Sequence, residues 1–467
     1  MSVADRSAAP PLGSDASLSG WGATTSSRCR VLQAHDASEV ARIVGSRTIP
    51  RAGLIARGAG RSYGDAALND DGHVLDMTAC NHIVTIDRER GRIVAQAGVT
   101  IAQLQAALAA QGLTLPVVPG TAHVTLGGAI ASDVHGKGHH RDGALARHVV
   151  AISLYTPAEG LLELTPASEP DLFYATLGGM GLTGVVVEAT LCAEPLPSGW
   201  VAEDVDRTTG LEQTLELMAA DEGHRYSVAW LDLLAPGSKS GRAVISRADP
   251  LPAHAAPTRD RHDERRALDR RVRPGRSLGV PRGVPTLLSP ARVRELNALR
   301  WRRAPRRARA RPQTLARYFF PLDSLDRWNR LYGAAGLIQY QFVVPDGQEA
   351  ALVRCFELVR ERRLPVYLAV FKRFGAAFGG PLSFPLAGWT LAIDMPAAAP
   401  GLHAALDRLD ELVAGCGGRV YLTKDARMRA EPARAMYPQL DRFQAVRARV
   451  DSGGALRSNL ARRLELC

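Results

Sequence analysis

Three glycine-dense segments in the first half of the chain constrain its fold more than any other feature. They span residues 55–65, 118–140 and 178–184, and each adjoins an apolar, strand-like run. Glycine lets the backbone approach a ligand closely and direct successive N–H groups at it, which suits a pyrophosphate. Three such loops in one stretch of chain favour a single extended ligand, and a dinucleotide is the natural candidate.

The first loop alone does not identify the dinucleotide. Its Gly-x-Gly at residues 58–60 does not open a plausible helix, and no acidic residue follows where a Rossmann ribose clamp would stand, so we reject an NAD site. Taken by itself, the segment is also compatible with a glycine-rich turn between two strands. The interpretation therefore depends on the other two loops and on the rest of the chain.

Length and composition indicate a globular protein of several domains. At 467 residues the chain is too long for one ordinary core, so two or three domains are expected. Residues 1–20 are rich in Ala, Ser, Pro and Gly and lack a basic region followed by an apolar one, which predicts a disordered tail and not a signal peptide. No apolar run approaches the roughly 20 residues of a membrane span.

The pattern of cysteines indicates the redox state of the protein's cellular compartment. The six cysteines form no CxxC pair and no cluster with histidine, which favours free thiols in a reducing environment. We therefore expect a cytoplasmic or peripheral membrane protein, with the periplasmic side left open.

The net charge of +11 comes from one segment. Residues 259–317 hold 19 arginines, no lysine and five acidic residues, which nets +14 and leaves the rest of the chain at −3. Such a segment suits anionic lipid headgroups or a phosphorylated lipid substrate, and it makes a peripheral membrane contact plausible. Aromatic residues for base stacking are scarce in it, so nucleic acid is not expected as a partner. The alternative is a solvated, partly flexible insertion.

Hydrophobic periodicity predicts a mixed chain of helices and strands. A serine cap and helical spacing predict a helix over 38–44, and further helices are expected over 100–111, 348–362 and 401–414. Alternating or β-branched runs predict strands that include 92–97, 149–155, 366–372 and 390–394. Beyond about residue 200, strands with helices after them suggest an antiparallel sheet with helices on one face.

The motifs in the three loops resemble those of a known flavoenzyme family. Gly-Arg-Ser-Tyr-Gly-Asp (60–65), His-Gly-Lys-x-His-His (135–140) and Gly-Leu-Thr-Gly (181–184) look like the flavin-binding loops of vanillyl-alcohol-oxidase-type FAD enzymes. Within that superfamily they are most similar to the decaprenylphosphoryl-β-D-ribose 2'-oxidases. The likeness continues at 339–342, 370–372, 381–385, 423–427 and 461–466, spans about residues 21–466, and weakens only near 250–315.

The resemblance implies a fold and a domain plan. The expected fold class is α+β, with a two-subdomain FAD-binding domain of vanillyl-alcohol-oxidase type and a substrate domain whose antiparallel sheet is flanked by helices. We expect a tail over 1–20, the FAD-binding domain over 21–198, the substrate domain over 199–415, and a return of the chain to the FAD-binding domain over 416–467.

The resemblance also implies an activity and partners. The family oxidises the 2'-hydroxyl of decaprenylphosphoryl-β-D-ribofuranose, a polyprenyl-phosphoryl sugar, to a 2'-keto intermediate. This is the first half of an epimerisation that supplies the arabinose donor for cell-wall arabinan. It implies an NADH-dependent keto-reductase as partner and a quinone or other electron acceptor. Two other readings stay open: an FAD-dependent oxidase of a soluble sugar or alditol, and a flavin-free sugar-phosphate binding protein.

The family likeness assigns catalytic roles to five residues. Lys424 is expected beside the isoalloxazine, where a cation near N1 would stabilise the reduced flavin. Lys372 and Gln341 match residues of the substrate pocket, and an ammonium in the apolar strand at Lys372 would need a bound phosphate or a carboxylate beside it. His135 is expected near the flavin for positioning or proton handling, and Tyr63 at the flavin and substrate mouth. Further substrate contacts are expected from Gln339, Phe319, Thr390 and Trp230.

The expected FAD contacts come mainly from the glycine loops. They are Arg57, Gly58, Ala59, Gly60, Arg61, Ser62, Tyr63, Gly64, Gly120, Thr121, Thr125, Gly127, Gly128, Ser132, Val134, His135, Gly136, Lys137, Val186 and Tyr421. Superfamily members that bind FAD covalently use a histidine in the first loop. Because Arg61 stands at that position, we expect FAD to be bound non-covalently. His139 and His140 have no carboxylate or cysteine to complete a site, so no metal is expected.

The chain departs from the family pattern at three positions. Thr390 and Ala392 stand where the best-known members carry an asparagine and a cysteine, and Phe319 replaces a pocket tyrosine. The cysteine is the target of covalent nitroaromatic inhibitors and not a catalytic requirement. We therefore expect no such adduct at Ala392.

Overall fold

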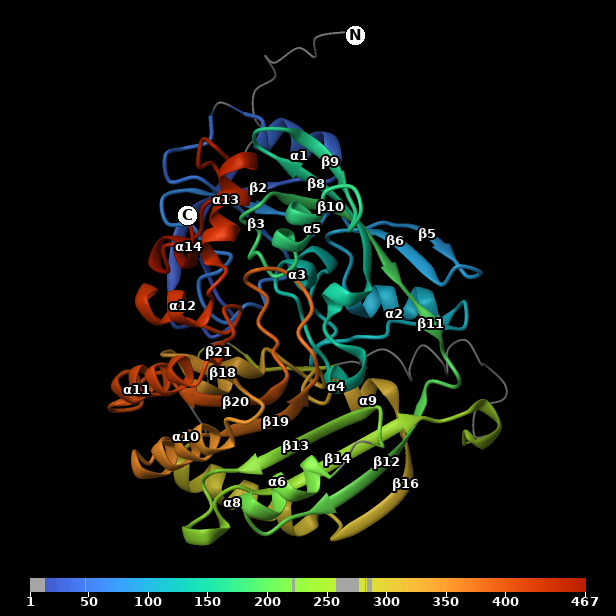
Figure 1. The fold of residues 1–467 in the computed structure, drawn as a ribbon, viewed down its shortest axis with the longest axis vertical. Helices are drawn as coiled ribbons and strands as arrows, with labels where there is room; N and C mark the ends of the chain where they lie inside the picture. The colour runs from blue at the N-terminus through green and yellow to red at the C-terminus, as the bar shows by residue number, and fades with distance from the viewer. Residues whose placement is uncertain (1–12, 47, 221–222, 258–276, 282, 284–287) are drawn as a thin grey trace.

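The computed structural model describes residues 13–46, 48–220, 223–257, 277–281, 283 and 288–467. Figure 1 shows two parts stacked along the long axis. The upper part carries the first eleven strands and the C-terminal helices, and the lower part is built on one large sheet. Within the described residues, no helix is both long enough and apolar enough to cross a membrane.

A four-stranded sheet opens the chain, in the order β1-β2-β4-β3. Its strands are β1 (Ser14–Ser19), β2 (Ser26–Gln33), β3 (Leu54–Arg57) and β4 (His73–Asp76). β2 and β3 pair with β4 in parallel, while β1 pairs with β2 antiparallel over six residues. The expected tail over 1–20 was therefore wrong for Ser14–Ser19, because β2 supplies a ladder of backbone partners to this polar strand. Residues 1–12 lie outside the described residues.

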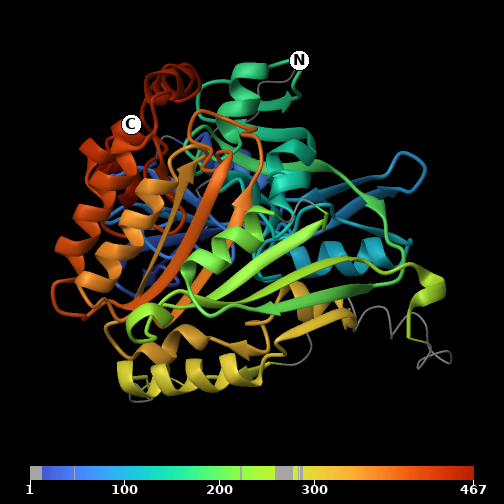
Figure 2. The ribbon, with the colours of Figure 1, turned by 60° about the horizontal axis from the view of Figure 1, so that its bottom comes forward.

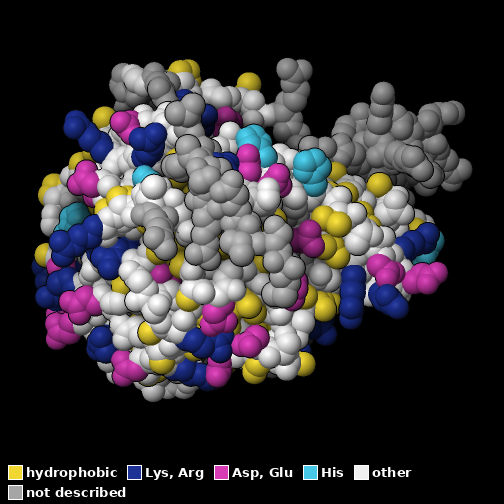
Figure 3. Space-filling model, turned by 90° about the horizontal axis from the view of Figure 1, so that it is seen from above, with side chains coloured by type: hydrophobic (Ala, Val, Ile, Leu, Met, Phe, Trp, Pro, Cys, Tyr) yellow, Lys and Arg dark blue, Asp and Glu magenta, His cyan; other side chains and the backbone are white. Residues whose placement is uncertain are grey.

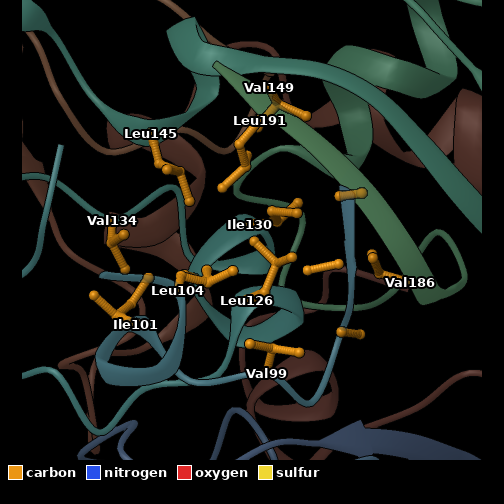
Figure 4. Close-up of a cluster of buried hydrophobic side chains, with 14 of the residues drawn as sticks. Val99, Ile101, Leu104, Leu126, Ile130, Val134, Leu145, Val149, Val186 and Leu191 are labelled. Atoms are coloured by element: carbon orange, nitrogen blue, oxygen red, sulfur yellow. The ribbon is translucent and has the colours of Figure 1, made fainter. Parts of the chain in front are cut away.

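A five-stranded antiparallel sheet follows, in the order β5-β6-β10-β8-β9. Its strands are β5 (Ile83–Asp87), β6 (Arg92–Gln96), β8 (Val149–Thr156), β9 (Gly160–Leu164) and β10 (Val185–Cys192). Helices α2 (Ile101–Ala109) and α3 (Leu126–Ala131) bury their apolar side chains against it. Figure 4 shows this core, which includes Val99, Ile101, Leu104, Leu126 and Ile130.

The helix ends follow local capping chemistry. α2 begins with a capping box in which Thr100 and Gln103 satisfy each other's backbone N–H groups. α1 (Ala37–Val44) is capped by Asp36, whose carboxylate accepts from the Glu39 N–H at 2.9 Å, and not by Ser38 as the sequence suggested. The remaining short elements of this part are β7 (Leu113–Thr114), α4 (His139–Asp142), α5 (Pro170–Thr176) and β11 (Glu194–Pro195).

The lower part is an eight-stranded sheet in the order β16-β12-β14-β13-β19-β20-β18-β21, and every pair in it is antiparallel. Its strands are β12 (Trp200–Arg207), β13 (Tyr226–Asp232), β14 (Arg242–Pro250), β16 (Arg307–Thr314), β18 (Leu337–Pro345), β19 (Leu368–Phe374), β20 (Gly388–Pro396) and β21 (Arg419–Val420). The α+β class and the antiparallel sheet expected from the sequence are confirmed.

Strand register divides the large sheet into an apolar and a polar face. The apolar side chains of β18, β19 and β20 pack in one core with helices α6 (Leu211–Ala219), α10 (Glu349–Glu361) and α11 (Leu402–Gly415). On the opposite face, Gln341 stands across from Ala392, Ala392 from Val370, and Lys372 from Thr390. This polar face borders the glycine loops of the upper part, because side chains of both line one pocket.

Helix α8 (Pro290–Arg303) covers one end of the polar face. Its Asn297 amide donates to Asp232 of β13 at 3.2 Å, and the Arg300 guanidinium lies 4.6 Å from the centre of the Trp230 ring. The expectation of helices on one face only is therefore wrong. Of the arginine-rich segment 259–317, residues 259–276, 282 and 284–287 lie outside the described residues, whereas α8 and β16 occupy most of the rest.

After the large sheet the chain packs again on the upper part. Helices α13 (Leu440–Val450) and α14 (Asn459–Arg463) lie beside the first sheet in Figure 1, whereas α12 (Ala430–Met436) contacts α11 and β21 of the lower part. The Leu54 N–H donates to the Ala455 carbonyl at 2.8 Å, and Arg463 pairs with both Asp65 and Asp425 at 2.7 Å. Seen from above, this end carries basic and acidic side chains interspersed (Figure 3).

Candidate active site

One pocket lies between the glycine loops and the polar face of the large sheet. All three loops contribute glycines to its wall, namely Gly58, Gly60, Gly120, Gly127, Gly128, Gly181 and Gly184. The sheet contributes the opposite wall, with Gln339, Gln341, Val370, Lys372 and Ala392. The loops that the sequence singled out therefore meet at one site.

Backbone and side-chain hydrogen bonds hold the first loop in place. The Arg57 guanidinium donates to the Ser19 and Ala67 carbonyls, at 2.8 and 3.0 Å. The Tyr63 N–H donates to the Thr423 carbonyl at 3.0 Å, which ties this loop to the segment that carries Lys424. The loop is thus fixed to β1 and to the segment around Thr423, and Arg57 also binds Ala67 just after the loop.

The second loop rests on the five-stranded sheet. The Gly127 N–H donates to the Ala97 carbonyl and the Leu126 N–H to the Val99 carbonyl, both at 2.8 Å. A methyl group on Gly127 would meet the Ala97 side chain at 2.9 Å, so only glycine lets α3 lie this close to the sheet.

The pocket fits a flavin dinucleotide. A side chain built on Gly120 would meet no protein atom within 4 Å, so the loop leaves open space where a ligand can approach the backbone. The buried Nδ1 of His135 has no hydrogen-bond partner among the described residues, although it borders the pocket. A bound ligand with a hydrogen-bond acceptor would satisfy it.

His135 sits at the centre of the site in its neutral form. Burial, and then the nearby lysines, hold its pKa well below the usual range. Its Nε2 lies 2.9 Å from the Gln341 amide nitrogen, which also donates to the Thr390 hydroxyl at 3.2 Å. Because Nε2 accepts from that amide, the imidazole proton stands on Nδ1.

Lys372 presents a cation in the sheet wall without a counter-charge. Among the described residues, no carboxylate lies within ion-pairing distance of its ammonium. Desolvation lowers its pKa to about 7, and Lys137 and Lys424 act in the same direction. A bound anion would offset the free-energy cost of burying this unpaired ammonium.

Lys424 forms a second cationic point, with an acid nearby. Its ammonium lies 4.1 Å from the centre of the Tyr63 ring, and desolvation lowers its pKa to about 8 while Asp394 opposes the shift. Burial raises the pKa of Asp394 to about 7. The Gln339 amide donates to Asp394 at 2.5 Å, and the other oxygen of that carboxylate has no partner among the described residues.

Most of the residues proposed from the sequence line the pocket. All five proposed catalytic residues do so, as do Gln339 and all but three of the proposed cofactor contacts. Gly64, Gly136 and Lys137 lie outside the lining. The Lys137 side chain turns instead to the Tyr318 carbonyl and ring.

Three proposed substrate residues also lie outside the lining. Phe319 is buried against Tyr226, Trp230 lies beneath Arg300, and Thr390 stands behind Gln341. The two histidines at the end of the second loop bind backbone groups: His139 Nδ1 accepts from the Gly375 N–H at 3.1 Å, and His140 Nε2 lies 2.9 Å from the His224 carbonyl.

Other residues of the site were missed. Asp394 could have been found from strand periodicity, since it shares a face with Thr390 and Ala392. The aromatic rim was not readable from the sequence: Trp21 and Trp328 pack edge to face with ring centres 6.1 Å apart, and the Arg61 guanidinium lies 4.0 Å from the Trp21 ring centre.

Comparisons with known proteins agree with the pocket. The FAD binding domain family model matches residues 30–165. Decaprenylphosphoryl-beta-D-ribose oxidase of Mycolicibacterium smegmatis is 38% identical over 96% of this chain and 97% of its own length. L-galactono-1,4-lactone dehydrogenase 2 of Oryza sativa is 31% identical over 46% of this chain and 34% of its own length. L-gulonolactone oxidase of Bos taurus is 33% identical over 30% of this chain and 31% of its own length.

The two partial matches cover less than half of this chain, whereas the first relative matches nearly from end to end. The chain is therefore an FAD-dependent oxidoreductase and belongs to the decaprenylphosphoryl-β-D-ribose oxidase family.

Proposed function

We propose that the enzyme oxidises the 2'-hydroxyl of decaprenylphosphoryl-β-D-ribofuranose to a ketone, the first half of an epimerisation to the arabinose donor. The observation that carries this proposal is the near end-to-end match to a relative named for that substrate. The pocket supports it, because the wall facing the glycine loops offers amides for sugar hydroxyls and a cation for a phosphate.

Bound FAD would supply the hydride acceptor for such an oxidation, and the loop residues with Tyr421 would hold it. The chain's own groups orient the sugar. The Gln341 side-chain nitrogen donates to His135 and Thr390. The side-chain oxygen of Gln341 is therefore left to accept from a sugar hydroxyl. The unpaired Asp394 oxygen is proposed to take up the alcohol proton, with help from the Tyr63 hydroxyl, which is hydrogen-bonded to Gln339.

Lys372 is proposed to bind the substrate phosphate, and this gives a pH-dependent prediction. Because its pKa is about 7 in the free enzyme, the ammonium form is lost as pH rises through 7. KM for the lipid-phosphate sugar should therefore rise between pH 6 and 8, by up to about tenfold for each pH unit above the pKa. Lys372→Met should raise KM at pH 6 and flatten the profile, while KM of an unphosphorylated sugar stays unchanged. A wild-type KM that is flat over this range would contradict the assignment.

FAD is proposed to be held non-covalently. Arg61, at the position of the covalent histidine, is engaged with the Trp21 ring and carries no nucleophilic atom for a flavin bond. Denaturation and filtration should therefore release all of the yellow colour. Colour retained on the protein would contradict this assignment.

Product analysis tests the proposed function. With decaprenylphosphoryl-β-D-ribose and an artificial electron acceptor, we expect a product lighter by two hydrogens that borodeuteride labels at C2'. An NADH-dependent keto-reductase would complete the epimerisation, and a quinone or another acceptor would take the electrons. Turnover of free pentoses or alditols at low millimolar concentration, without turnover of the lipid-linked sugar, would favour an oxidase of a soluble sugar.

Ala392 gives a prediction on inhibition. Its side chain lines the pocket opposite Gln341, at the position where the best-known family members carry a reactive cysteine. Incubation of the turning-over enzyme with a nitroaromatic inhibitor should give no adduct by intact mass, whereas Ala392→Cys should acquire one equivalent. An adduct on another pocket residue of the wild type would contradict this prediction.

A further inference from the structure

Exposed apolar side chains are concentrated in one segment of the chain. Eight large hydrophobic side chains are exposed among the described residues, and four of them fall between residues 278 and 322. They are Leu278, Leu296, Leu299 and Leu322, exposed by 77%, 56%, 42% and 39%. Scattered exposed leucines are normal, but four between residues 278 and 322 indicate a binding surface.

Helix α8 carries two of these leucines in a stripe. Residues 292, 296, 299 and 303 follow each other at helical spacing, so Arg292, Leu296, Leu299 and Arg303 lie along one line of the helix. Val293 and Asn297 form the neighbouring buried stripe. α8 therefore leaves two leucines exposed beside the stripe that the protein covers.

The charge of this helix is strongly positive. α8 contains five arginines and one glutamate, a net +4, and Arg292, Arg294, Arg302 and Arg303 are exposed. Figure 2 shows the helix, in yellow, along the outer edge of the lower part. The opposite end of the molecule, by contrast, mixes both signs of charge (Figure 3).

This surface adjoins the pocket mouth. Leu322 itself lines the pocket. Leu278 lies in β15 (Leu278–Gly279), which pairs with β17 (Leu325–Asp326), and β17 begins three residues after Leu322. Val293 of α8 packs in one cluster with Tyr63, against Trp328 of the pocket rim. A partner seated on α8 would therefore stand beside the entrance to the active site.

The side chains favour a lipid surface over nucleic acid. Trp301 is the only aromatic residue of α8, and it is engaged by the guanidinium groups of Arg207 and Arg242 at 4.2 and 4.7 Å from its ring centre. It is therefore not available to stack on a base. Leucines flanked by arginines match an anionic headgroup layer with acyl chains beneath it.

We propose that α8, with Leu278 and Leu322, forms a docking surface for a bilayer rich in anionic lipids, which brings the pocket mouth to a substrate whose lipid tail stays in the membrane. The proposal rests on the proposed function for the identity of that substrate. Apart from Leu322, which lines the pocket, the residues that it names lie outside the pocket lining.

Vesicle cosedimentation tests the surface without catalysis. The full-length FAD-loaded protein is mixed with phosphatidylcholine vesicles, with or without about 30 mol% phosphatidylglycerol. We expect binding only to the anionic vesicles, weakened by salt. Leu296→Ser/Leu299→Ser and Arg302→Glu/Arg303→Glu should each lower the partition coefficient by about tenfold or more. Matched changes at exposed sites elsewhere, Leu161→Ser and Arg360→Glu/Arg362→Glu, should leave it unchanged.

Turnover of detergent-dispersed decaprenylphosphoryl-β-D-ribose, measured in parallel, separates the two proposals. Unchanged kcat in both α8 variants together with weakened vesicle binding would support the docking surface. Failure of the wild type to bind anionic vesicles, or equal binding by the α8 variants, would overturn it even if turnover is normal. Retention on duplex DNA without vesicle binding would also overturn it. Vesicle binding through α8 without oxidation of the sugar would support the surface and overturn the proposed function.

Discussion

Replacing Lys424 by methionine should lower kcat by about 10²–10³-fold while FAD remains bound. Lys424 lies in the pocket wall with its ammonium over the Tyr63 ring, and no carboxylate among the described residues neutralises it directly. A preorganised positive charge in a poorly hydrated site stabilises negative charge that develops during the reaction, at no cost of reorganisation. Methionine keeps the length and bulk of the side chain and removes only the charge.

Three measurements are needed for this variant. The flavin content from absorbance should stay at one equivalent, the melting temperature should not fall, and kcat for the lipid-linked sugar should collapse. Lys239→Met is the matched control, because Lys239 is an exposed lysine far from the pocket lining. A Lys424→Met enzyme with full flavin content and a kcat within about threefold of wild type would show that the charge is dispensable.

Replacing Gly64 by alanine should cost the enzyme most of its bound flavin and lower its melting temperature. The added methyl would collide with the Asp425 carbonyl oxygen and lie 2.8 Å from the Ala426 Cα. Both are backbone atoms and cannot rotate away, so the first glycine loop and the segment 423–426 must separate. Overpacking of this kind costs roughly 1–3 kcal/mol of stability.

The effect on the cofactor follows from the same contact. The Tyr63 N–H, one residue before Gly64, donates to the Thr423 carbonyl and so joins the first glycine loop to segment 423–426. Both segments line the pocket. We expect a lower melting temperature and a weaker FAD affinity in equilibrium dialysis. Gly453→Ala serves as control, since a methyl there meets nothing within 4 Å. An FAD affinity and melting temperature equal to wild type would contradict the close approach of these segments.

The parts of the site that could be predicted from the sequence are those fixed by local backbone chemistry or by the family motifs. The three glycine loops were recognisable because close backbone approach demands glycine, and their convergence on one pocket follows from the fold. Lys372, Gln341 and Lys424 came from the motif match, and strand register then places Lys372 and Gln341 on one face.

The parts that could not be predicted depend on tertiary packing. Phe319 and Trp230 were assigned to the pocket by family likeness, but Phe319 faces the Tyr226 ring and α8 covers Trp230. Lys137 stands in a binding motif, yet its side chain binds the Tyr318 carbonyl, and neither residue lines the pocket. The role of β1 was hidden because its polar sequence gives no sign of the partner strand that orders it.

The most direct test of the proposed function is anaerobic mixing of the FAD-loaded protein with decaprenylphosphoryl-β-D-ribose. We predict that the flavin absorbance near ~450 nm is lost within one turnover and that free ribose at the same concentration leaves it unchanged. An absorbance that survives excess lipid-linked sugar but bleaches with a free pentose or alditol would contradict the proposed substrate.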